Sequence, residues 1–435
     1  MARSAAQLKF PAWTNPGWFL GQLTGRLSAP ERKLVWMIGL YDFTYALSSV
    51  FVNVFLFRHG NDWRVVGLFN LSQFLFVIPA FTAGGYLARR LSYLRSYQLG
   101  FVFNAALYAA VLLLREDSIR HPWALGLLAG LGVGFYYLGQ HALTFELVHS
   151  KRRDHFFSVS LVLSSAFRIL APALSGWIIH QVNGWAQAGR WMVNGYHLVF
   201  LATLLAYLAL IYESTRVRVR PHQGRFRYWQ TLTHPANPDW NRLMAGYFLW
   251  GVRNGVFWFA TSLFIYRIFR DEWVVGAYGM GSNLLAVGAS ALLAKWVSPG
   301  NRDFGVMASC LLMGAASALL TWRMDLAALI LFALLNSVGV SWFQVAFSAA
   351  SLSVIDQAFE GKKRRLEYLT IRELPLGLGR VTGMAIFLGG QQLYGEAGLR
   401  WSFLILGLAQ AAVWMTVPGK ANQQKKPTQR RKDAK

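Results

Sequence analysis

The chain of 435 residues has a single cysteine and no motif of the kind that holds a nucleotide phosphate or a metal ion. Cys310 alone cannot form an internal disulfide or a thiolate metal cluster. There is no Gly-rich loop of the Walker type and no His/Cys cluster at metal-ligand spacing, which argues against ATP hydrolysis and a resident metal. The sequence therefore predicts no metal, no cofactor and no enzymatic activity.

Charge is also scarce, and acidic charge most of all. Charged residues make up 14% of the chain against 55% hydrophobic residues, which is too apolar for an ordinary soluble domain. There are 43 Lys and Arg residues but only 19 Asp and Glu residues. Because the basic residues lie in short loops and form no separate domain, we expect them to contact anionic lipids at the cytoplasmic face, with no nucleic acid as a partner.

Twelve long apolar stretches account for the hydrophobic composition. A helix that crosses the hydrocarbon core needs about 20 predominantly apolar residues. The sequence thus predicts an all-α membrane protein with twelve transmembrane helices, at 34–57, 66–87, 98–114, 123–146, 157–180, 196–213, 242–266, 273–294, 304–322, 326–355, 368–393 and 399–418.

The basic residues alternate between the two sides of these predicted spans. With both termini in the cytoplasm, the cytoplasmic segments carry 31 Lys and Arg residues and the opposite loops carry 9. Cytoplasmic loops of membrane proteins retain such an excess of positive charge. We therefore predict a multi-pass protein of the plasma (inner) membrane with both termini cytoplasmic.

The longest internal polar stretch divides the spans six and six. The predicted organisation is a cytoplasmic N-terminal arm (1–33), a six-helix bundle (34–213), a cytoplasmic linker (214–240), a second six-helix bundle (241–418) and a basic tail (419–435). The tail is polar and lysine-rich, a composition typical of disorder.

The two halves share a repeat. Arg153 and Arg365 follow spans four and ten, Arg168 and Arg380 lie in the middle of spans five and eleven, and both separations are 212 residues. Duplicated six-span halves with a binding site between them at the midplane are a known transporter plan.

Three segments carry a resemblance to a known family. They are Gly85-Tyr86-Leu87-Ala88-Arg89-Arg90-Leu91-Ser92 between spans two and three, the segment from Glu146 to Arg153 after span four, and Glu367-Tyr368-Leu369-Thr370-Ile371-Arg372-Glu373 running on to Arg380. In this twelve-span frame the chain resembles the major facilitator superfamily over residues 34–418, close to a bacterial branch of it. The resemblance implies two pseudo-symmetric six-helix bundles and a central cavity lined by spans one, four, seven and ten, with help from five and eleven.

The chain departs from the family pattern at several positions. Arg89 stands where the loop motif normally has Asp, and Ser92 stands where it has Gly. Leu125 to Gly134 in span four lacks the arginine of many proton-coupled members. The usual charge pairing at the inner gate and the usual proton coupling therefore do not transfer directly.

Ionisable residues within the predicted spans are the main site candidates, because a charge at membrane depth is costly and normally faces a cavity or a partner. Asp42 is either a proton-carrying carboxyl or a permanently ionised partner of one of the arginines. Arg168 and Arg380 either bind an anionic group of a substrate or lock the halves together. The full set of substrate and proton-coupling candidates is Asp42, Arg168, Arg253, Asn254, Glu373 and Arg380, with pairing to Arg372 as the alternative for Glu373.

Two further groups of residues are weaker candidates. The first could line the cavity, with packing or simple hydrogen bonding as the alternative: Tyr41, Asn53, Tyr137, Gln140, His141, Trp258, Asn336 and Gln344. The second could close the cytoplasmic end as an inner gate: Arg89, Arg90, Glu146, Arg153, Asp356 and Arg365.

The sequence thus predicts a monomeric secondary active transporter that moves a small solute by alternating access. Three arginines against two carboxylates within the spans favour an anionic or amphipathic solute, and proton-coupled export is one mode. Two alternatives stay open. One is a flippase of the same fold acting on a lipid or lipid-linked glycan, and the other is a non-transporting membrane sensor or scaffold.

Overall fold

The computed structural model describes residue 25 and residues 27–417, apart from gaps at 150–151, 189–193, 218, 220–224, 234–237, 294–301, 324, 359 and 361–363. Throughout these described residues the secondary structure is helical, with no strand. The predicted N-terminal arm up to residue 24 and the predicted tail 419–435 lie outside them. An all-α fold, as predicted, is therefore confirmed.

Six long helices follow one another in the first half of the chain. They are α2 (Ala29–Gly60), α3 (Trp63–Arg90), α4 (Tyr93–Leu114), α5 (Pro122–Leu147), α6 (Arg153–Gln187) and α7 (Gly195–Thr215), with a short 3-10 helix η2 (Arg115–Arg120) after α4. Each covers one predicted span, and most extend past it at both ends. The extensions were not predicted because polar helix ends carry no apolar signal.

Side-chain caps fix where several of these helices begin. Asp62 accepts a hydrogen bond from the backbone N–H of Arg64 at 2.8 Å, and Asn194 accepts one from Tyr196 at 3.0 Å. Such caps satisfy amide groups that have no partner within the helix. These polar residues separate long apolar runs into distinct helices.

The second half begins with a short helix in the predicted linker, α8 (Tyr228–Thr233). The long helices that follow are α9 (Pro238–Phe269), α10 (Glu272–Leu293), α11 (Arg302–Trp322), α12 (Leu326–Gln357) and α13 (Arg365–Ala412), which continues into a 3-10 helix η4 (Val413–Thr416). At Gly395 the backbone of α13 is not helical, with φ 57° and ψ −132°. Glycine tolerates this positive φ, so α13 consists of two helices, and these correspond to the eleventh and twelfth predicted spans.

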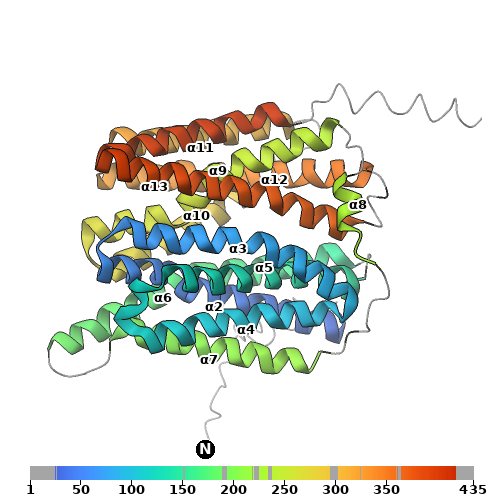
Figure 1. Ribbon diagram of the computed structural model, residues 1–435, viewed down its shortest axis with the longest axis horizontal. Helices are drawn as coiled ribbons and strands as arrows, with labels where there is room; N and C mark the ends of the chain where they lie inside the picture. The colour runs from blue at the N-terminus through green and yellow to red at the C-terminus, as the bar shows by residue number, and fades with distance from the viewer. Residues whose placement is uncertain are drawn as a thin grey trace, which may run out of the picture.

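All the long helices run roughly along one axis of the molecule, as Figure 1 shows. Helices α2 to α7 gather on one side of it and α9 to α13 on the other, while α8 stands across one end. Between the two groups the principal contacts are α3 with α13 and α6 with α10, with a smaller contact of α2 with α9.

Packing within the first group is repeated in the second. Helix α3 packs on α5 as α10 packs on α12, α4 on α5 as α11 on α12, and α2 on α6 as α9 on α13. The two main contacts between the groups, α3 with α13 and α6 with α10, are also equivalent when each helix of the first group is matched to its counterpart in the second. The helix order and the packing order therefore agree with the repeat seen in the sequence.

Glycines allow the closest of these helix contacts. A Cβ on Gly130 of α5 would collide with the backbone oxygen of Gln73 on α3, and one on Gly383 of α13 would collide with the backbone oxygen of Val252 on α9. Close backbone approach through small residues is common between helices in membranes. The glycine spacing of α5 thus has a packing role.

Nine helices in the described part of the chain are long and apolar enough to cross a membrane. They are α2 to α7, α11, α12 and the long segment Arg365–Thr416. The protein is therefore a multi-pass membrane protein. Helices α9 and α10 have the required length but fall short in apolar character over the range searched.

Candidate functional site

An ion pair joins α2 to α6 in the middle of the first group of helices. Oδ1 of Asp42 lies 2.7 Å from Nη2 of Arg168, which donates a hydrogen bond to it. The Asp42 side chain is 7% exposed and that of Arg168 is 50% exposed. The Asp42 side chain is therefore enclosed by protein, while the Arg168 side chain is half-exposed. Charge-assisted hydrogen bonds of this length are the stronger kind.

A second pair of the same construction joins α9 to α13. Nε of Arg380 donates to Oδ1 of Asn254 at 3.0 Å, and the guanidinium carbon lies 5.5 Å from the ring centroid of Phe74 on α3. Asn254 and Arg380 are 126 residues apart, as are Asp42 and Arg168. Both members of the second pair follow their counterparts by 212 residues. The two pairs thus occupy equivalent places in the repeat.

The two pairs differ by one chemical group. Asp42 supplies a carboxylate and Asn254 supplies a neutral amide of nearly the same shape. The first pair is therefore neutral overall when Asp42 is ionised, and the second carries one positive charge. Among the described residues no carboxylate lies within ion-pair distance of Arg380, whose hydrogen-bond partner is the neutral amide of Asn254.

Arg253, next to Asn254, occupies a different environment. It is only 3% exposed, its Nε donates to Oγ of Ser317 at 3.0 Å, and its Nη2 donates to Oδ1 of Asn336 at 2.6 Å. Its guanidinium carbon lies 4.3 Å from the ring centroid of Phe257. A buried charge needs such hydrogen-bond partners. Because these partners bridge α9, α11 and α12, Arg253 holds the second group together rather than facing the first.

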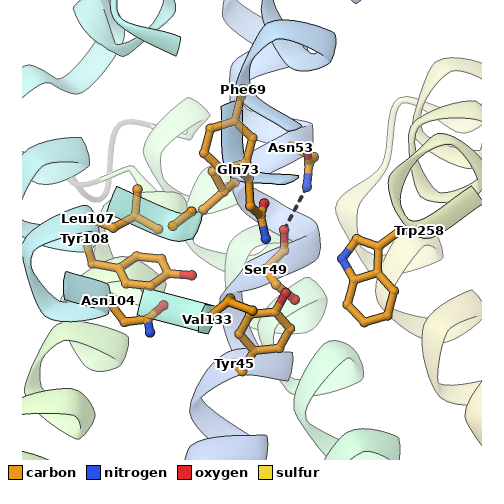
Figure 2. A pocket seen from close by; sticks show the side chains of 12 residues that line it. Tyr45, Ser49, Asn53, Phe69, Gln73, Asn104, Leu107, Tyr108, Val133 and Trp258 are labelled. Atoms are coloured by element: carbon orange, nitrogen blue, oxygen red, sulfur yellow. Dashed lines mark hydrogen bonds between the residues drawn. The ribbon is translucent and has the colours of Figure 1, made fainter. Parts of the chain in front are cut away.

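A small cavity with several polar lining residues lies within the first group of helices (Figure 2). Its volume is about 20 Å³, which is room for about one water molecule. Uncharged side chains from α2, α3, α4 and α5 line it, and Trp258 of α9 closes it from the other group: Tyr45, Ser49, Asn53, Gln73, Asn104 and Tyr108 are the polar members. Two cavity candidates from the sequence, Asn53 and Trp258, therefore line this cavity.

The remaining cavity candidates are placed in several environments. Tyr41 is fully buried and stacks on Tyr136, and Tyr137 packs edge-on against the same ring. Gln140 and His141 lie further along α5, beyond the lining of this cavity. Gln344 is exposed on α12.

At the end of the molecule nearest α8, one ion pair joins the two groups. Nη2 of Arg89 on α3 lies 3.7 Å from Oε1 of Glu367 on α13, and Glu367 is 3% exposed. The same carboxylate oxygen accepts a hydrogen bond from the backbone N–H of Arg227 in the linker at 3.4 Å. Sequence reasoning named Arg89 but missed Glu367 as its partner, because only the fold brings α3 and α13 together.

Two other inner-gate candidates, Arg153 and Arg365, lie against one aromatic ring at the same end. The guanidinium carbons of Arg153 and Arg365 lie 5.8 Å and 5.3 Å from the ring centroid of Phe145, next to Glu146 on α5. Cations at this range are attracted to an aromatic face. Repeat-related arginines thus converge on one ring.

Three more candidates lie near this end. Arg90 and Asp356 are exposed. Oε1 of Glu373 lies 3.5 Å from Nε of Arg372, and Nη1 of Arg372 donates a hydrogen bond to the hydroxyl of Tyr247 at 3.5 Å. The structure therefore pairs Glu373 with Arg372, as one of the two sequence interpretations expected.

An ion pair at the opposite end also joins the two groups of helices, and it was not predicted from the sequence. Nη1 of Arg58 on α2 lies 2.6 Å from Oε1 of Glu272 on α10, and the hydroxyl of Tyr196 donates to that oxygen at 3.0 Å. Beside it, Nδ1 of His180 lies 3.0 Å from Oδ1 of Asp271. Neither Arg58 nor Glu272 was among the candidates selected from the sequence.

This fold is that of major facilitator superfamily transporters. The human organic anion transporter MFSD10 (TETRAN) superposes with a TM-score of 0.59 over 90% of this chain and 100% of its own, at 18% identity. A mutant of the nucleoside transporter NupG gives a TM-score of 0.69 over 89% and 98%, at 12% identity. A structure titled for substrate recognition in proton dependent oligopeptide transporters gives 0.66 over 89% and 97%, at 13% identity.

Two bacterial proteins are similar in sequence. The "Uncharacterized protein YqgE" of Bacillus subtilis is 26% identical over 381 residues, 87% of each chain. The "Uncharacterized protein in sodM 3'region" of Geobacillus stearothermophilus is 31% identical over 186 residues, which are 42% of this chain and 83% of that protein. The chain belongs to the family of this Geobacillus protein. No family model matches this chain.

Proposed function

We propose that the protein is a secondary active transporter that moves a small solute by alternating access between two halves. The single observation that carries this proposal is the pair of equivalent interior sites, Asp42 with Arg168 and Asn254 with Arg380, one in each group of helices. Ionised groups are rarely held at this depth without a functional reason.

The proposed architecture is twelve transmembrane helices in two six-helix halves. Counting the two parts of α13 separately and including α9 and α10, the long helices described number twelve. The repeated packing order within the two groups supports the division into halves. The polar residues of α9, among them Arg253 and Asn254, account for its weak apolar signal, and such residues face the interior of a transporter.

The proposed transport cycle alternates between two closures. Arg89 with Glu367 joins the halves at one end, and Arg58 with Glu272 joins them at the other. By the distribution of basic residues the first end is cytoplasmic, with both termini on that side of the plasma membrane. Opening either end requires that its ion pair separate while the other stays formed.

Asp42 is proposed as the proton-coupling group. Protonation of its carboxyl would remove the charge that holds Arg168, whose side chain is already 50% exposed. A carboxylic acid also changes from a pure acceptor to a donor on protonation. Arg380 is proposed to bind an anionic group of the solute, since its present partner is a neutral amide.

The alternating closures can be tested by cross-linking. The only native cysteine, Cys310, is buried, so cysteines placed by Arg58→Cys and Glu272→Cys can be bridged selectively with a bifunctional thiol reagent that a reductant cleaves. We expect the bridge to abolish solute flux in proteoliposomes and the reductant to restore it. The matched pair Arg89→Cys and Glu367→Cys should behave likewise, and the flux of each single-cysteine variant should be insensitive to the reagent.

The solute itself is sought with a panel of organic anions, cations and neutral compounds in the same vesicles. Flux of an anion that depends on the protein supports the proposal. Flux that continues through both bridged variants would refute alternating access. If fluorescent lipids cross faster than in empty vesicles while no solute moves, the flippase interpretation replaces it.

A further inference from the structure

A second cavity in the described part of the chain has a lining that shares no residue with the polar cavity or with the two proposed transport pairs. Its volume is about 350 Å³, and it opens between α2, α6 and α7. Trp36, Met37 and Leu40 of α2, Phe167 of α6 and Leu210 of α7 form its walls. Every lining residue belongs to the first group of helices, so this groove is not part of the space between the halves.

The groove has one charged end. Lys33 of α2 and Glu213 of α7 line it together with the apolar residues. Lys33 is exposed, while Glu213 lies 3.1 Å from Arg216, measured from Oε1 to Nη1. Because Arg216 neutralises Glu213, the charge of Lys33 remains as the excess at the mouth of the groove.

The position of this charged end fixes its level in the membrane. Lys33 lies in the first turns of α2 and Glu213 in the last turn of α7, at the end of the molecule that carries the basic loops. From Lys33 to Leu40 the helix rises about 10 Å, so the apolar walls extend from headgroup level into the hydrocarbon region. Trp36, which is 39% exposed, lies between Lys33 and Leu40. This is the interfacial level at which Trp is enriched in membrane proteins.

We propose that this groove is a binding site for one phospholipid of the leaflet at the basic end. One acyl chain lies between α2, α6 and α7, and the phosphodiester anion contacts the ammonium of Lys33. The volume is within the range of small-molecule sites, roughly 300–1,000 Å³, and is too small for a helix, which is about 10–12 Å wide with its side chains. Contact with acyl chains is not selective, so the charge of Lys33 supplies the preference for a phosphate. This site is independent of the proposed transport cycle.

Native mass spectrometry of the full chain, released from vesicles of equimolar phosphatidylglycerol and phosphatidylethanolamine doped with diacylglycerol, tests the site. One phospholipid and no diacylglycerol should remain bound. Lys33→Ala should lower the bound fraction about fivefold, the effect of about 1 kcal/mol for one basic residue near anionic lipid. The matched control is Arg32→Ala, because Arg32 is an exposed neighbour on α2 that does not line the groove.

A second variant keeps the charge and fills the groove. Leu40→Trp should release the lipid although Lys33 is intact, with size-exclusion chromatography confirming that the protein remains folded. Equal retention in Lys33→Ala and Arg32→Ala would overturn the proposal, as would diacylglycerol binding as well as phospholipid. A photoreactive residue at Leu40 that captures the protein's own N-terminal arm, or a second copy of the chain, instead of lipid would also overturn it.

Discussion

The Asp42–Arg168 pair and the Asn254–Arg380 pair are the same structure built with different charge. Each joins the first helix of its group to the fifth, each spans 126 residues, and the hydrogen bonds are 2.7 Å and 3.0 Å long. Only the acceptor differs, a carboxylate in one and an amide in the other. The two halves thus share this geometry, and only the first half has a titratable acceptor at the position, which is consistent with separate roles for the two halves.

We infer that the first pair responds to protons and the second binds solute. A carboxylate beside Arg168 can exchange a proton and switch the pair from neutral to positive, whereas Asn254 cannot titrate. Arg380 keeps its charge through the cycle, and that constant charge suits an anionic ligand.

The largest difference is expected between two arginine variants. Arg380→Met should weaken binding of an anionic solute about 30-fold or more, since removing a charged partner in a desolvated site costs about 2 kcal/mol or more. Arg168→Met should weaken it less than about fivefold, because Asp42 already neutralises Arg168. Half-saturation of solute exchange in proteoliposomes measures both. Equal losses in the two variants would remove the distinction between the halves.

Making the second pair resemble the first should impair binding. Asn254→Asp places a carboxylate against Arg380 in the geometry that Asp42 has with Arg168, and this carboxylate competes with the solute anion. We expect a loss of about tenfold in apparent affinity, or about 1.4 kcal/mol, that is relieved as the pH falls and the new carboxyl is protonated. Affinity unchanged across pH would show that Arg380 does not contact the solute.

The difference in charge between the two pairs should also affect the stability of the protein, but less strongly than it affects solute binding. Asp42→Ala removes a charge-assisted hydrogen bond, worth about 1.5–3 kcal/mol, and Asn254→Ala removes a hydrogen bond from a cation to a neutral amide, at the lower end of that range or below. The exposure of Arg168 reduces the first value through solvent screening. Thermal unfolding in detergent should therefore show a slightly larger decrease for Asp42→Ala. A larger decrease in unfolding temperature for Asn254→Ala would contradict the interpretation that only the first pair contains an ionised acceptor.

Much of this arrangement was predictable from the sequence. Helix positions follow from apolar runs of membrane length, and the 212-residue repeat placed Arg168 and Arg380 at equivalent positions before any contact was known. The equivalence of Asp42 and Asn254 follows from the same spacing. The length of an apolar run and the spacing of a repeat can both be read directly from the sequence, without knowledge of the fold.

The partners of these residues were not predictable in the same way. Arg253 was expected to line the cavity, but Ser317 and Asn336 from two other helices enclose it. Glu272 and Glu367, which join the two groups of helices, were not selected because both lie near helix ends, where acids are common. Contacts of this kind depend on which helix faces pack together, and the near-continuous apolar character of the spans conceals those faces.

The most direct test of the account compares proton-driven accumulation with solute exchange in wild type, Asp42→Asn and the matched control Asp117→Asn, whose carboxylate is exposed on η2. Asp42→Asn gives the first pair the acceptor of the second, and we expect it to reduce accumulation under an imposed pH gradient to the level without a gradient, while exchange persists. The control should behave as wild type. Gradient-driven accumulation that survives in Asp42→Asn would contradict the assignment of proton coupling to the Asp42–Arg168 pair.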